Sequence, residues 1–83
     1  MKARYIITNF PGLLTCLEVQ TNSGQTQGVG HFQTPIEAIN YCKDSLKDRG
    51  LSCDMLPQMD SDNNPQWVGP WVELEPEQER EAA

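Results

Sequence analysis

The residues best suited to covalent or metal chemistry are three cysteines, Cys16, Cys42 and Cys53, and one histidine, His31. A zinc site would have to use all four, and the paired ligand spacing of such sites is absent. A nucleophile pair of His31 with Cys16 or Cys42 is possible, but nothing in the spacing favours it. The cysteines are odd in number, and each falls where a small buried hydrophobe would serve. The sequence therefore predicts reduced structural thiols, with no metal, no cofactor and no enzymatic activity.

A second candidate is the acidic segment "DSDNN", where Asp60, Asp62 and Asn64 alternate as in the opening of an EF-hand calcium loop. That loop requires Gly at its sixth position and a bidentate Glu at its twelfth. Here Pro65 and Trp71 occupy those positions. The segment is therefore predicted to be a polar loop rather than a calcium site.

The strongest candidates for partner binding are Trp67 and Trp71, in the segment "QWVGPWVEL". In a regular strand a spacing of four puts both on one face, opposite Val68 and Val72. If the valines face the core, the tryptophans face outward, and tryptophan is enriched at the centres of protein interfaces. The alternative is that a bulge at Gly69–Pro70 turns one tryptophan into the core.

Carboxylates surround these tryptophans in the sequence. The chain has 12 acidic and 6 basic residues, and 54–83 holds eight of the acids and one of the bases. The glutamates alternate toward the C-terminus, which is typical of a solvated tail. If the acids cluster at one end of the sheet, they would steer a basic partner toward it. The predicted partner-binding residues are Trp67, Trp71, Asp54, Asp60, Asp62 and Glu73.

The net charge of −6 argues against direct contact with nucleic acid, because a polyanion requires a basic face. A protein with a basic surface is the better-matched partner. No apolar run approaches the roughly 20 residues that span a bilayer. The apolar stretch near the start is also too short for a signal-peptide core. We therefore expect a cytoplasmic protein that has no membrane contact.

The clearest element is a helix in the segment "TPIEAINYCKDSLKDRG". Thr34 can cap it, Pro35 suits its first position, and Glu37 completes a capping box. Gly50 supplies the left-handed residue that ends it. The predicted apolar stripe consists of Ile36, Ile39, Cys42 and Leu46, with Ala38 and Tyr41 beside it.

The remaining elements are strands, indicated by period-two alternation and turn residues. The order β-β-β-α-β-β predicts an α+β fold, an antiparallel sheet of four to five strands with one helix packed on one face. Pro70 places the last strand at a sheet edge or on a bulge. Residues 1–74 are predicted to form a single compact domain, and 75–83 an acidic mobile tail. The strands are expected at 4–8, 13–21, 26–32, 51–56 and 66–74.

This layout and acidity resemble those of small inhibitors that phages and mobile elements encode against host defence systems, the anti-CRISPR proteins among them. The shared features are size, charge, a "MKA" start that runs into a strand, and one helix on a sheet. Several such inhibitors imitate DNA charge or occupy nucleic-acid channels. The resemblance implies a non-enzymatic inhibitor that blocks a basic nucleic-acid-binding surface of a host defence complex. The alternative hypothesis is a small structural or regulatory subunit that pairs through its edge strand.

Overall fold

The computed structural model describes residues 1–52 and 54–73 of the chain. Within them the antiparallel sheet with one helix confirms the predicted α+β fold class and the order β-β-β-α-β-β, except that the predicted last strand is divided into β5 and β6, which gives six strands. Cys53 and the predicted mobile tail at 75–83 lie outside the described residues. The elements are β1 (Lys2–Asn9), β2 (Thr15–Thr21), β3 (Thr26–Phe32), α1 (Pro35–Asp48), β4 (Leu56–Met59), β5 (Pro65–Val68) and β6 (Val72–Glu73).

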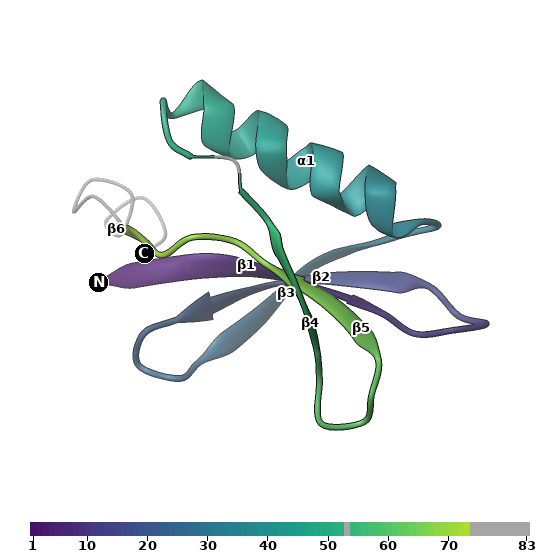
Figure 1. The fold of residues 1–83 in the computed structure, drawn as a ribbon. Coiled ribbons are helices and arrows are strands. Elements are labelled where there is room, and N and C mark those ends of the chain that lie inside the picture. The colour runs from purple at the N-terminus through teal and green to yellow at the C-terminus, as the bar shows by residue number, and fades with distance from the viewer. Residues whose placement is uncertain (53, 74–83) are drawn as a thin grey trace.

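The sheet has the strand order β3-β2-β1-β5-β4, and β6 pairs with β1 beyond the end of β5. Every pairing is antiparallel, and β1 is the central strand, flanked by β2 on one side and by β5 and β6 on the other. Helix α1 lies across one face of this sheet (Figure 1). The other face, called the open face below, carries no helix in the part of the chain that the structure describes.

The helix begins at the predicted cap, Thr34, and is terminated by Gly50 as predicted, but Glu37 reaches the residue before the cap instead of the cap itself. At its start, the backbone N–H of Glu37 donates to Thr34 Oγ1 at 3.4 Å, and the Glu37 carboxylate accepts from the backbone N–H of Gln33 at 3.3 Å. At its end, Gly50 has a φ of +70°. The following N–H, that of Leu51, reaches back to the Leu46 carbonyl at 3.0 Å. These bonds satisfy backbone groups that a helix end otherwise leaves unpaired.

The apolar face of α1 differs from the prediction at one position. Ala38, Cys42 and Leu46 are buried, as expected for a stripe with a spacing of four. Ile36 is 68 % exposed, so its predicted place in the stripe is wrong. At about 100° per residue, Ile36 lies roughly 160° around the helix from Ala38 and therefore faces away from the sheet.

The core lies between α1 and the central strands. Ile7 and Leu17 come from β1 and β2, and they meet Ala38 and Cys42 of the helix. The Tyr5 and Ser45 hydroxyls share a hydrogen bond of 2.9 Å, which ties β1 to the helix. Each large apolar side chain buried here contributes about 1.5–3 kcal/mol to stability. The partly buried residues packed around this core are Tyr5, Phe32, Ile39, Met55 and Trp67.

The strand predicted at 51–56 is displaced along the chain. The strand β4 is Leu56–Met59 instead, and it contains Pro57. Leu51 and Ser52 are used differently: Leu51 completes the helix end, and the Ser52 hydroxyl donates to Asp54 at 3.2 Å. Pro57 is tolerated because β4 is an edge strand and needs no donor on its outer side.

The predicted final strand is divided by a bulge. Trp67 lies opposite Ile7 and Val72 lies opposite Ala3, so five steps along this segment match four steps along β1. Gly69 sits at the break, and its N–H donates to the Tyr5 carbonyl at 2.9 Å. Of the two sequence predictions for this strand, the bulge is confirmed. The edge position is wrong for β5, because β5 lies between β1 and β4.

Candidate binding surface

The strand register defines which residues share the open face, because directly opposed residues point to the same side of a sheet. Ile6 of β1 lies opposite Val68 of β5, and Val68 lies opposite Leu56 of β4. These three form an apolar row across the open face. Val68 is 7 % exposed although no helix covers it, whereas Leu56 at the sheet edge is 67 % exposed. The row therefore offers apolar area to a partner mainly through Leu56.

Trp71 lies next to this row, at the point where the bulge ends. Its side chain is 44 % exposed, and the Arg4 guanidinium carbon lies 4.5 Å from the centre of its ring. Arg4 Nε also donates to Gln20 Oε1 at 2.9 Å, which holds the guanidinium in place. Such a cation–π contact contributes about 0.5–1 kcal/mol at an exposed site. Trp71 is thus oriented before any partner arrives, which lowers the entropic cost of binding.

A polar row borders the apolar one on its other side. Gln58 Nε2 donates to Gln66 Oε1 at 2.7 Å, and Gln66 Nε2 donates to Thr8 Oγ1 at 3.0 Å. This chain of bonds links β4, β5 and β1. It satisfies the buried Thr8 hydroxyl, so this part of the open face is held by its own hydrogen bonds.

The two tryptophans do not share a face, contrary to the expectation from their spacing. Trp67 pairs with Ile7, points to the helix side and packs against the core. The extra residue in the bulge shifts the alternation, so Val72 returns to the helix side and Trp71 faces the other way. One tryptophan therefore serves the core, which was the alternative interpretation of this segment.

Asp54 lies near Trp67. Both residues line a shallow hollow of about 300 Å³ between α1 and β4, together with Lys43 and with Leu56, which at the sheet edge also borders this hollow. The Asp54 carboxylate accepts from the Ser52 hydroxyl at 3.2 Å. The structure thus brings Asp54 and Trp67 together, but on the helix side of the sheet.

Asp60 has a role within its own turn. One carboxylate oxygen accepts the backbone N–H groups of Asp62 and Asn64 at 2.9 and 2.8 Å, and the other accepts Asn64 Nδ2 at 3.2 Å. The backbone hydrogen bond from Asn64 is the main cause that lowers the pKa of Asp60. The turn also needs Asn63, whose φ of +63° is one that asparagine tolerates. Asp60 is therefore a turn-forming carboxylate with few lone pairs left for a partner.

The predicted acids do not gather at one end of the sheet. Glu73 pairs with Lys2 at the start of β1, and its carboxylate lies 3.4 Å from the N-terminal amine. Asp60 and Asp62 lie in the β4–β5 turn, next to the part of β5 that pairs with Thr8 near the end of β1. Figure 1 shows this turn pointing away from α1 and distant from β6. Asp62 is exposed there. Carboxylates therefore lie at both ends of the open face. They are separated because β5 and β6 run antiparallel along β1, from near its end to its start.

The cysteines occupy different environments. Cys42 is buried in the core, and burial raises the pKa of its thiol to about 12, so it is protonated at neutral pH. Cys16 is half-buried on the open face and lies directly opposite His31.

Among residues 1–52 and 54–73, no three His, Cys, Asp or Glu side chains are placed to hold a metal ion. No helix in those ranges is long and apolar enough to cross a membrane.

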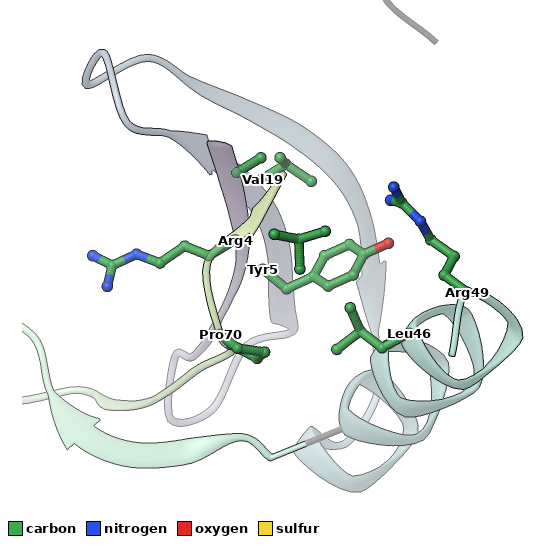
Figure 2. A pocket seen from close by; sticks show the side chains of 8 residues that line it. Arg4, Tyr5, Val19, Leu46, Arg49 and Pro70 are labelled. Atoms are coloured by element: carbon green, nitrogen blue, oxygen red, sulfur yellow. The ribbon is translucent and has the colours of Figure 1, made fainter. Parts of the chain in front are cut away.

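A small apolar hollow of about 120 Å³ opens between β1 and the C-terminal end of α1. Figure 2 shows the Tyr5 ring reaching toward the helix, with Leu46 below it and Arg49 at the rim. Arg4 leaves β1 in the opposite direction, toward the open face. The hollow is smaller than the about 300–1,000 Å³ typical of metabolite sites, so at most a single side chain of a partner fits it.

The apolar row and the position of Arg4 were not predicted from the sequence. The alternation of Arg4, Ile6 and Thr8 along β1 was a usable signal, since residues two apart share a face. The residues that lie opposite them on β5 and β4 could not be predicted in this way. Leu56 was predicted to end a strand at 51–56, whereas it begins β4, and the sequence left open whether the last strand contains a bulge. Comparison with family models, curated proteins and solved structures found no match.

Proposed function

We propose that the chain is a non-enzymatic binding protein of the anti-CRISPR type, an inhibitor that blocks a basic nucleic-acid-binding surface of a host defence complex. It acts in the cytoplasm of an infected host cell, as a phage protein. Its acidic surface mimics the charge of DNA, and it contacts neither nucleic acid nor membrane.

The observation that carries the proposal is the open face. It has an ordered and half-exposed Trp71, an apolar row that ends in the exposed Leu56, and carboxylates at both ends of the sheet. An apolar, aromatic centre with a charged rim is the usual anatomy of a protein interface. The net charge of −6 matches this rim to a basic partner.

The two parts of this surface have different tasks. Trp71 and Leu56 would be desolvated on binding and would slow dissociation. Asp62 and Glu73 would remain near the rim, where charge accelerates encounter more than it adds affinity. We place Asp54 and Trp67 outside this interface because they line the hollow between α1 and β4, and in our proposal Asp60 supports the interface only by shaping the turn that presents Asp62.

The proposal is tested by titrating the protein into host CRISPR effector complexes and measuring their binding of labelled target DNA by gel shift. We expect at least one complex to lose DNA binding. Trp71→Ala should weaken that inhibition about tenfold or more, in line with a hot-spot residue. A panel in which no complex binds the protein or loses DNA affinity would contradict the proposal.

Matched controls separate the surface from general effects. Leu13→Ala removes an apolar side chain that is 77 % exposed in the β1–β2 turn and is not part of the apolar row, and it should leave inhibition unchanged. Asp44→Asn removes one exposed carboxylate from α1 and is the control for Asp62→Asn. If both members of each pair weaken inhibition equally, the open face is not the binding surface.

A further inference from the structure

We propose that the chain self-associates through β3, with the β3 strands of two copies pairing antiparallel so that their sheets join. This surface is an edge of the sheet, distinct from the open face, and the proposal is independent of the inhibitor function above.

The first observation is the position of β3. It is a terminal strand of the sheet, and in the described part of the chain it pairs on one side only, with β2. Backbone N–H and C=O groups alternate along the outer side of such a strand and can accept a further strand.

The second observation is that this edge has neither proline nor charge, so the bulge at Val29 is its one protective feature in the described part of the chain. The other edge strand, β4, has only four residues and contains Pro57, which has no N–H. By contrast, β3 has seven residues, none of which is proline or charged. Its one register shift leaves Val29 unpaired but keeps Thr26–Gly28 and Gly30–Phe32 opposite β2. Proteins usually guard a strand of this length with lysine or proline if it is not used.

The distribution of charge favours a second copy as the occupant. The 18 charged residues of the chain, 12 acidic and 6 basic, all lie outside residues 19–36, which include β3 and its turns. Two chains of net charge −6 can therefore meet here with no like charges directly opposite each other. A basic target protein would find no carboxylate on this stretch, so the edge suits self-pairing better.

The geometry of self-pairing is determined by symmetry. An antiparallel pair of identical strands has its two-fold axis perpendicular to the sheet, so both helices would lie on the same face. Tyr41, on the β3 side of α1, packs against Phe32 with ring centres 5.7 Å apart and remains 46 % exposed. A neighbouring copy joined at β3 would cover part of this exposed ring.

The test is sedimentation equilibrium of the wild-type chain over a wide concentration range, with charge variants of each edge. We expect a monomer–dimer equilibrium that Val29→Lys, in the middle of β3, weakens at least tenfold. Gln27→Lys gives a second variant of this edge if the first one folds poorly. Met59→Lys places the same charge on β4 at a residue that is 58 % exposed, and it should leave the dimer intact. Melting curves confirm that each variant is folded.

The added positive charge cannot by itself explain why the β3 variants weaken the dimer while Met59→Lys leaves it intact. Each lysine reduces the net charge from −6 to −5, so general repulsion between copies would decrease in all three variants. A wild-type chain that remains monomeric throughout, or a dimer that only Met59→Lys dissociates, would overturn the proposal. Neither result affects the inhibitor function, which is measured by loss of DNA binding.

Discussion

Successive residues of β1 enter two different regions of the molecule. Tyr5 and Ile7 point toward α1 and join the core, whereas Arg4 and Ile6 point to the open face. On the covered face, packing against the helix fixes each side chain. On the open face, neighbouring side chains fix each other through the Trp71 stack and the glutamine hydrogen bonds. Residues of the covered face should therefore control stability, and those of the open face should control binding.

The largest effect should come from the same leucine-to-alanine change made on each face. Leu17 is buried in the core and Leu56 is 67 % exposed on the open face. Leu17→Ala should lower the free energy of unfolding by about 2–5 kcal/mol, because it leaves a cavity. Leu56→Ala should change it by about 0.5 kcal/mol or less. Urea unfolding followed by tryptophan fluorescence measures both, and equal losses would contradict the difference between the faces.

The two tryptophans give the next largest contrast. Trp67→Ala should lower the free energy of unfolding by about 3 kcal/mol, the lower end for a large aromatic, since Trp67 is only partly buried. Trp71→Ala removes mainly the contact with Arg4 and should reduce stability by about 1 kcal/mol or less. Thermal melts of the two variants decide this point. If Trp71→Ala proves the more destabilising, the assignment of the two side chains to opposite faces is wrong.

A smaller effect is expected from the Cys42 thiol at alkaline pH. Burial raises the pKa of this thiol from its ordinary value of 9.0 to about 12, so the folded state holds the proton more tightly. The stabilising contribution is complete below pH 9 and decreases as the pH rises toward 12. The difference in unfolding free energy between wild type and Cys42→Ala should therefore shrink over this range. A difference that is constant with pH would show that the thiol is not buried.

The smallest effect should come from Asp60 in acid. Hydrogen bonds from its own turn lower the pKa of Asp60, so its contribution to stability is present above the usual aspartate value of about 3.9 and is lost as the pH falls below it. Asp60→Asn keeps the shape of the turn but should remove this part of the acid dependence. Asp62→Asn, in the same turn, should have the same melting temperature as the wild type at each pH between 2 and 7. Identical pH profiles for the two variants would argue against this role of Asp60.

The sequence predicted best where the structural signals are local. Thr34, Glu37 and Gly50 determine both ends of α1 within a few residues of themselves, and the structure confirms them. The strand near 51–56 was misplaced because Leu51 and Ser52 are held by the end of the helix, while an edge position allows Pro57 inside β4.

The candidate site was harder to predict because it depends on contacts between distant segments. Whether Trp71 is exposed depends on one extra residue in a bulge. A glycine and a proline indicate where the bulge is, but they do not indicate to which face of the sheet the next side chains point. The separation of Asp62 from Glu73 depends on strand order, which residue alternation does not contain. Their role in binding remains a prediction.

The most direct test of the open face is the association rate with the effector complex that the protein inhibits, measured by stopped flow at two salt concentrations. The doubly neutralised variant Asp62→Asn/Glu73→Gln should associate more slowly than the wild type at low salt, and its rate should depend less on salt. Asp44→Asn, on the helix, should behave as the wild type does. If the doubly neutralised variant and the wild type associate equally fast at both salt concentrations, these carboxylates do not steer the partner to the open face.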